Sequence, residues 1–423
     1  MLSLIIFITM LIILLLNRIV QKNAFICAFT TFIWCISLGL SSIGFAGLYP
    51  TSVNVCIMAL IYIIVFFVGT CITSKLAFRF FPSKNKQLEF DFSYERIMFF
   101  LLPAWIYSLL FIPKAISLLN NYGYAALRSF AFNASDVYMS VVELLVFQCF
   151  IEPIYISTNI LFLLILYLKR NYKVIPAILI NFILYSLLFG GRSIIVNFIS
   201  VFIFLVVVYR KINIFHILVK NKKIIISLIS IVGVFIYMVS LRKFSALSPL
   251  ETILIYLSGP FSFFDQLLSK ELFPQKLLYG KVLFGAITSP ISYFIRLIYD
   301  STYQTGFSVM NNILQEYITI GENIKFNALA TILYPAICDF SYLGIIIYPL
   351  MLGGVSRTIE IYYFKTFNYK ILSIYLFIAS PIMMSTMNFY LSGLSTLTSI
   401  FVIIHCFKRK RESSKNGVAK SIS

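Results

Sequence analysis

The stretch that decides the fold spans residues 174–209 and runs VIPAILINFILYSLLFGGRSIIVNFISVFIFLVVVY. Arg192 is its single charged side chain, and it lies near the middle, preceded by Gly190 and Gly191 and followed by Ser193. As helix, these 36 residues measure about 54 Å, whereas two crossings of a bilayer core need about 60 Å. The stretch therefore predicts two membrane helices joined by a tight turn, with Arg192 at or slightly below the membrane interface.

The composition of the whole chain agrees with this prediction. Of 423 residues, 60% are hydrophobic and only 12% are charged, and the mean hydropathy is +0.95. Soluble domains contain about a quarter charged residues, and a core cannot absorb this much apolar surface. We expect an all-α polytopic integral membrane protein, a single domain over residues 1–423, with about eleven transmembrane helices. The expected spans are 2–16, 24–47, 52–72, 97–117, 140–168, 174–190, 193–209, 224–241, 339–356, 371–388 and 391–407.

Basic residues are distributed unevenly between the apolar runs. The net charge is +19, but most lysines and arginines cluster in short segments between alternate runs. This is the pattern of the positive-inside rule, so we expect these segments in the cytoplasm and no nucleic-acid partner. The N-terminus is then outside and the C-terminus is cytoplasmic. The clusters lie at residues 18–22, 75–96, 169–173, 210–223 and 357–370 and in the tail 408–423, which is expected to be disordered.

Two segments on the outward side are longer than simple turns. One is residues 119–139, and the other is a large external loop over residues 242–338 that is still rich in Leu, Ile, Phe and Tyr. Because residues 250–268 and 307–320 have helical apolar spacing, we expect amphipathic helices at the outer membrane surface there. Three prolines are expected to interrupt the helices of this loop: Pro260, Pro274 and Pro290.

Arginines on the outward side are candidate ligands for an anion. Arg192 lies in the tight turn, where Gly191 and Ser193 allow close approach of a ligand, and Arg242 follows the next outward helix at the same level. Two guanidiniums at headgroup depth suit a lipid-borne phosphate or diphosphate, which arginine holds with two hydrogen bonds. The alternative is that each arginine only extends toward anionic lipid headgroups.

Carboxylates are candidate general bases. Glu152 is expected near mid-membrane, where an ionisable group suggests function, unless its helix begins near Pro153, which would put it at the interface. Asp339 lies where the large loop re-enters the membrane, and at a helix start its alternative role is to favour the helix dipole.

Histidine and cysteine patterns give no sign of a metal site or another cofactor. His216 and His405 both fall on the expected cytoplasmic side. The seven cysteines lie in or beside apolar runs without metal-ligand spacing, so we interpret them as packing residues.

The arrangement of these motifs resembles the O-antigen or oligosaccharide repeat-unit polymerases, the Wzy type. The resemblance covers about residues 90–390: the GGRS turn, the arginine of SLRKF, a large outward loop, and N…YP…DF…G…G at re-entry. By this resemblance Arg192 and Arg242 fall on the family's arginines, and Asn327, Asp339 and Gly344 fall on the re-entry motif. Ser341 departs from the pattern, because many relatives have glycine there.

The resemblance implies a metal-independent glycosyltransferase of the bacterial inner membrane that elongates a surface polysaccharide, such as that of lipopolysaccharide. Such enzymes transfer a growing glycan from undecaprenyl diphosphate to a sugar hydroxyl of the next lipid-linked unit on the outer leaflet. The partners are then the lipid membrane, the lipid-linked donor and acceptor, and, as a further candidate, a chain-length regulator protein. We expect Arg192 and Arg242 to hold the diphosphate with help from Arg128 and Arg296, and Glu152 and Asn327 to contact substrate. The resemblance identifies no general base.

Three alternatives remain. A flippase of lipid-linked oligosaccharide usually has more spans, pseudo-repeated halves and short loops. A ligase-like transferase would have an external histidine, and a dolichol-phosphate-type transferase would have acidic residues in its first outward loop, which residues 48–51 lack. The sequence leaves the sugars, the linkage and the stereochemical outcome open.

Overall fold

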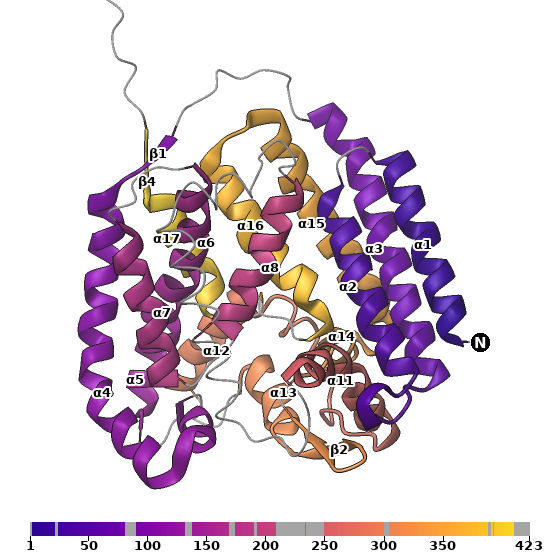
Figure 1. The fold of residues 1–423 in the computed structure, drawn as a ribbon, viewed down its shortest axis with the longest axis horizontal. Coiled ribbons are helices and arrows are strands. Elements are labelled where there is room, and N and C mark those ends of the chain that lie inside the picture. The colour runs from indigo at the N-terminus through magenta and orange to yellow at the C-terminus, as the bar shows by residue number, and fades with distance from the viewer. Residues whose placement is uncertain are drawn as a thin grey trace, which may run out of the picture.

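The computed structural model describes most of the chain. The described residues are 2–21, 24–80, 90–131, 138–168, 174–189, 193–208, 233, 249–299, 304–327, 329–387, 391 and 393–409. Helices dominate this part, and its strands form two antiparallel pairs, β1 (Phe90–Phe92) with β4 (Phe407–Arg409) and β2 (Ile318–Gly321) with β3 (Ile324–Phe326). Figure 1 shows the long helices side by side, with β1 and β4 at one end and β2 at the other.

The helices follow one another with short links where the chain is described. In order they are α1 (Leu2–Val20), α2 (Phe25–Ser42), α3 (Val53–Phe80), α4 (Tyr94–Ala131), α5 (Val141–Val146), the π-helical turn η2 (Phe147–Ile151), α6 (Glu152–Leu168), α7 (Ile175–Phe189), α8 (Ser193–Val208), α11 (Pro249–Ser269), α12 (Gly285–Ile298), α13 (Gly306–Leu314), α14 (Leu333–Phe340), α15 (Gly344–Thr366), α16 (Tyr369–Met383) and α17 (Ser395–His405).

Seven helical stretches in the described part of the chain are long and apolar enough to cross a membrane. They lie in α1, α2, α3, α4, α5 with α6, α14 with α15, and α16, while α7 and α17 contain shorter apolar stretches. Large apolar side chains such as Leu4 and Phe7 of α1 are exposed at 61% and 56%. Polar Asn17 of the same helix is buried. This agrees with the all-α membrane protein expected from the sequence.

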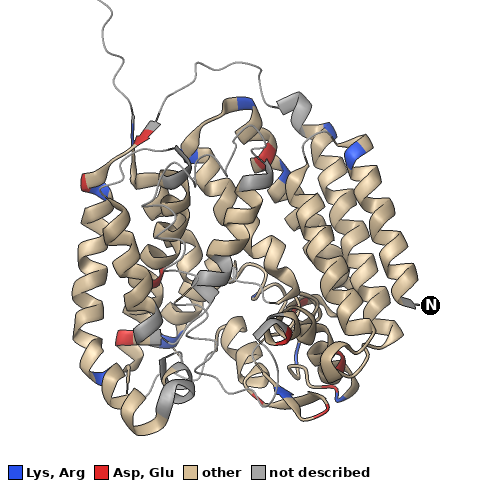
Figure 2. Ribbon diagram, in the orientation of Figure 1, with Lys and Arg blue, Asp and Glu red and all other residues tan. Residues whose placement is uncertain are grey.

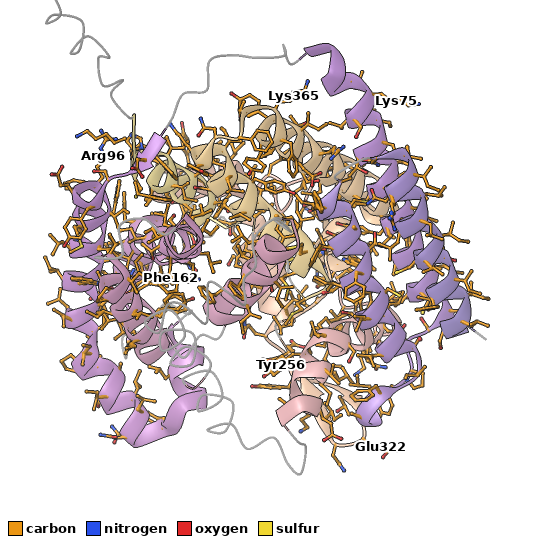
Figure 3. The ribbon with its side chains drawn as sticks, turned by 45° about the horizontal axis from the view of Figure 1, so that its top comes forward. Lys75, Arg96, Phe162, Tyr256, Glu322 and Lys365 are labelled. Carbon is orange, nitrogen blue, oxygen red and sulfur yellow. The ribbon has the colours of Figure 1, made fainter. Side chains whose placement is uncertain are left out.

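Charged residues gather at the two ends of the helices and leave the middle nearly bare (Figure 2). Figure 3 places Lys75, Arg96 and Lys365 at one end and Glu322 at the other. Arg96 also links α4 to the end of α17, because its guanidinium donates to the backbone carbonyls of His405 and Phe407. Three segments expected on the same side of the membrane therefore lie at the same end of the structure.

Close packing of α3 against α15 depends on glycine. A methyl group at Gly69 would lie 2.6 Å from the Leu350 carbonyl oxygen, and one at Gly353 would lie 2.5 Å from the Phe66 carbonyl oxygen. Small residues of this kind let the backbones of membrane helices approach closely, and dispersion contacts then replace the hydrophobic effect that lipid cannot supply.

A buried ion pair joins four helices. The Glu360 carboxylate accepts from Arg357 Nη1 at 2.7 Å, from the backbone N–H of Phe25 at 2.7 Å and from the Tyr375 hydroxyl at 2.6 Å. Arg357 Nε donates to Ser74 Oγ at 2.8 Å. The sequence suggested that Arg357 and Glu360 belong to a cytoplasmic segment, but α15 extends to Thr366 and buries both inside the helices. Glu360 thereby caps the start of α2.

Polar contacts hold α11 and the β2–β3 hairpin to the link between α2 and α3. Ser52, just before α3, donates its backbone N–H and its hydroxyl to the two oxygens of Asp265 on α11, at 2.8 and 2.6 Å. The β2–β3 hairpin pairs with the α2–α3 link, because Tyr49 N donates to Ile320 O and Glu322 N donates to Gly47 O, both at 2.8 Å.

Several local expectations were wrong. The outward loop expected at residues 119–139 is helical as far as Ala131, because α4 continues without a cap at residue 117. Of residues 307–320, only those up to Leu314 are helical. The sequence ITIG, with its alternating pattern, forms β2 and pairs with β3. The turn between the two strands contains Asn323 with a φ of +60°.

Two further corrections concern prolines and the tail. Pro260 and Pro290 lie inside α11 and α12, and each helix continues through its proline although one backbone hydrogen bond is missing there. Of the three prolines, only Pro274 lies between helices. In the tail, Lys408 and Arg409 form part of β4, because β1 offers them a partner strand. Of the expected span 224–241, the structure describes only Gly233.

Replacing Glu360 with alanine is expected to lower the free energy of unfolding by about 3 kcal/mol, because it leaves the Arg357 guanidinium buried without its counter-ion. Thermal unfolding of the detergent-solubilised protein measures this effect. Glu322→Ala, at the exposed hairpin turn, is the matched control and is expected to unfold like the parent protein. Equal unfolding temperatures for the two variants would contradict the assigned role of the ion pair.

Candidate functional site

The helix that contains Glu152 begins far from that residue. Ser140 caps it through a reciprocal pair of bonds: the Glu143 backbone N–H donates to Ser140 Oγ at 3.3 Å, and the Ser140 N–H donates to Glu143 Oε2 at 2.7 Å. Glu152 therefore lies eleven residues beyond the first helical residue, Val141, or about 16 Å along the axis. The alternative, a helix that starts near Pro153, is wrong, because helical structure already begins at Val141.

A widened helical turn immediately precedes Glu152. The Glu152 backbone N–H donates to the carbonyl of Phe147, five residues earlier, and this bond closes the π-helical turn η2. Pro153 explains the widening, because it has no N–H to offer the Cys149 carbonyl four residues before it. Such π turns inside helices are frequent at functional sites, since they shift side chains from their regular positions.

Two serine bonds fix α6 against α17 and so determine what Glu152 faces. Ser157 Oγ donates to Ser399 O at 3.0 Å, and Ser399 Oγ donates to Pro153 O at 3.5 Å. One turn nearer the start of α17, the Ser395 hydroxyl hydrogen-bonds the Glu152 carboxylate. Ser395 is the first residue of α17, so the positive end of that helix dipole also favours the carboxylate.

Helix α12 brings a polar face to the same region. Ser289 and Ser292 are buried, and Tyr293 is half-buried on the same side of the helix. The opposite side exposes Ile287, Ile291, Phe294 and Ile298. A helix of a soluble protein shows the reverse pattern, so α12 is built to face lipid on one side and a polar interior on the other.

Tyr293 and Cys149 connect α12 with Glu152. Tyr293 lies within electrostatic range of the Arg296 guanidinium and of the Cys149 thiol, and Cys149 in turn lies within range of Glu152. We call Glu152, Cys149, Tyr293, Arg296 and Ser395 the Glu152 site. It combines a carboxylate that can exchange a proton with a cation that can hold an anion.

Of the Glu152 site, the sequence identified only Glu152 and Arg296. The fuller signal is the spacing in residues 287–298, where Ser289, Ser292, Tyr293 and Arg296 recur every three or four residues opposite the apolar positions. Cys149 and Ser395 have no such signal, because their place depends on how η2 and α17 pack.

Asp339 has a different setting from Glu152. Its buried carboxylate accepts from the backbone N–H groups of Val282 and Leu283 and from the Tyr348 hydroxyl. Its backbone carbonyl accepts from Tyr279 N at 3.0 Å. These protein donors occupy the carboxylate, so the geometry makes Asp339 the anchor of the turn at residues 278–283 rather than a group open to substrate.

The remaining predicted site residues are only partly described. Asn327 Nδ2 donates to Gln315 O at 3.1 Å and so links β3 to the end of α13. Arg128 lies in the last turn of α4 and Ser193 begins α8, but their side chains lie outside the description. Gly191, Arg192 and Arg242 lie outside the described residues altogether.

The end of α7, just before the sequence Gly190–Arg192, is held by Tyr138. The Tyr138 hydroxyl donates to Leu188 O at 2.7 Å, and Lys114 Nζ donates to Tyr138 O at 3.1 Å. Burial raises the pKa of Tyr138 above its usual range, so the phenol stays protonated and keeps donating at any physiological pH. These bonds therefore link α4, the start of α5 and the end of α7.

The re-entry motif contains a strained residue. Ser341 has φ +54° and ψ −151°, a region that residues with a side chain rarely adopt. Ser341→Gly, which restores the residue expected from the family resemblance, should raise the free energy of unfolding by about 1 kcal/mol. Thermal unfolding in detergent measures the gain, and an unchanged or lower unfolding temperature would contradict the assigned strain.

Adding a methyl group at Gly344 of this motif should destabilise the protein, and the same change at Gly39 of α2 is the matched control. A methyl group at Gly344 would lie 1.9 Å from the Ala336 carbonyl oxygen, so Gly344→Ala should destabilise the protein by about 2 kcal/mol. At Gly39 of α2 no described atom lies within 4 Å of such a methyl group, and Gly39→Ala should not destabilise it.

Comparison with known proteins gives no match. No protein-family model, no curated protein and no solved structure matches the chain. Its function therefore has to be inferred from its own residues and their arrangement.

Proposed function

We propose that the protein polymerises lipid-linked oligosaccharide repeat units in a bacterial plasma membrane. The donor is a glycan on undecaprenyl diphosphate, and the acceptor is a sugar hydroxyl of the next lipid-linked unit on the outer leaflet. No nucleotide sugar takes part. The energy of the sugar–diphosphate bond drives each transfer, and the diphosphate is the leaving group.

The proposed topology has eleven crossings, with the N-terminus outside and the C-terminus in the cytoplasm. Lys75, Arg96 and Lys365 lie at the same end in Figure 3, which supports a cytoplasmic end. The elements of the large loop, α11, α13 and β2, lie at the opposite end in Figure 1, which supports an outward position for residues 242–338.

The observation that most favours a transferase is a carboxylate well inside an apolar helix, with an arginine on a second helix. Glu152 comes from the α5–α6 helix, and the exposed Arg296 comes from α12, whose Tyr293 lies within electrostatic range of Cys149. Ionisable groups at such depth are costly and usually functional. An arginine suits the diphosphate, while a carboxylate suits the acceptor hydroxyl.

In this proposal the outward arginines stabilise the leaving group. Breaking the sugar–diphosphate bond adds charge to the carrier, and cations fixed at headgroup depth lower the energy of the transition state as that charge develops. Arg192 and Arg242 are assigned this role from the sequence, with Arg128 and Arg296 assisting. Both substrates are confined to the membrane, so orientation contributes the remainder of the acceleration.

A non-enzymatic flippase of the same lipid is the second candidate. The Arg357–Glu360 pair favours it, because transporters use intramembrane ion pairs. The carboxylate of this pair, however, also caps α2 and accepts from Tyr375, which gives the pair a structural role.

Replacing Arg192 with alanine tests the polymerase. In a strain that lacks its own copy, Arg192→Ala should leave the surface glycan with a single repeat unit, because the diphosphate loses its main cation. Gel electrophoresis of the surface polysaccharide resolves the chain lengths. Arg192→Lys keeps the charge but not the paired hydrogen bonds, so it should give short chains at low yield.

Lys325→Ala is the matched control, since Lys325 is an exposed outward cation on β3. It should give the full ladder of chain lengths. A full ladder from Arg192→Ala would contradict the assigned role of that arginine, and lipid-linked units trapped in the inner leaflet of the deletion strain would favour the flippase.

A further inference from the structure

Most outward carboxylates that the structure describes already have a structural partner. Asp339 accepts from Val282, Leu283 and Tyr348. Asp265 accepts two bonds from Ser52. Asp339 is buried, and each Asp265 oxygen already accepts a hydrogen bond from Ser52, so both carboxylates have a structural role.

Apart from Glu152, the remaining described carboxylates on the proposed outward side are at helix starts or on the exposed surface. Glu143 completes the capping box of α5 and pairs with Lys114 at 3.6 Å. Glu251 lies in the first turn of α11, where the helix dipole accounts for an acid. Those on the exposed surface are Glu271, Glu316 and Glu322.

Glu152 differs from all of them. It lies about 16 Å along its helix, next to a π-helical turn, and part of its surface stays accessible. Its described polar neighbours are the Ser395 hydroxyl, which hydrogen-bonds one side, and the Cys149 thiol. The carboxylate therefore keeps lone pairs available for a further donor.

We propose that Glu152 is the general base of the transfer, an inference that rests on the proposed function and assigns its missing group. The acceptor sugar hydroxyl gives its proton to the Glu152 carboxylate as its oxygen bonds the anomeric carbon of the donor. The bond between that carbon and the diphosphate oxygen breaks, and its electron pair leaves with the diphosphate. Glu152 then releases the proton to water.

The neighbours of Glu152 suit this role. The Ser395 hydroxyl and the start of α17 hold the carboxylate in position and favour its ionised form before the reaction. Ser395 is therefore a positioning residue. Arg296 lies on the same face of α12 as Tyr293 and within electrostatic range of it. In this proposal Arg296 binds the anionic donor, and Glu152 binds the acceptor hydroxyl.

Purified protein in lipid vesicles with an isoprenoid-diphosphate-linked oligosaccharide tests the proposal. Glu152→Gln should lower kcat by about 100-fold or more, the usual range for removing a general base. KM for the lipid-linked unit should stay near that of the parent protein, since glutamine keeps the size and a hydrogen-bonding group. Glu152→Asp should recover part of the rate, and the acid limb of the pH–rate profile should be absent in Glu152→Gln.

Glu143→Gln is the matched control on the same helix, because glutamine also completes a capping box, and it should leave the rate unchanged. A Glu152→Gln rate close to that of the parent, with Arg192→Ala inactive, would overturn the base and leave the polymerase standing. A raised KM with unchanged kcat would make Glu152 a binding residue and also overturn the proposal. If the parent protein itself joined no units, the proposed function would fail, and the assignment of the base with it.

Discussion

Hydrocarbon around the helices reverses the usual relation between polarity and burial, and the organisation of this protein depends on that reversal. On α12 the exposed side is apolar, while serines and a tyrosine are turned inward. Because lipid cannot satisfy a polar group, a charge buried among the helices needs a partner inside the protein. The Glu152 site and the Arg357–Glu360 pair are two outcomes of this requirement: Glu152 is partly exposed as a residue, and Arg357 and Glu360 are buried.

Hydrogen bonds attach the segment that contains α11, α12 and the β2–β3 hairpin at three places. The Asp265 carboxylate accepts from Ser52 just before α3, the hairpin pairs with the α2–α3 link, and Leu283 N donates to Asp339. Within this segment, α12 contacts α13 and α17. The segment that binds substrate in the proposed reaction is thus fixed at several points to the membrane helices.

Sequence periodicity predicted the helical class and most apolar helices, because bilayer length and charge clustering are local properties of the chain. Its failures share one physical origin. The extent of α4, the π-helical turn before Pro153 and the enclosure of Asp339 depend on contacts between segments distant in sequence, such as Val282 with Asp339. Ser341 has a positive φ, and the only sign of this in the sequence was the glycine that the family resemblance leads one to expect there. Glu152 stays a candidate from the sequence, but its neighbour Ser395 follows only from the packing of α6 on α17.

The most direct test of the account is reconstitution with a single substrate. Protein in vesicles that contain only the isoprenoid-diphosphate-linked repeat unit should produce glycans of two or more units and release the free lipid diphosphate in equal number to the bonds formed. No nucleotide sugar should be needed. If the lipid-linked unit instead crosses the bilayer without being joined to another, the protein is a transporter, and the polymerase account is contradicted.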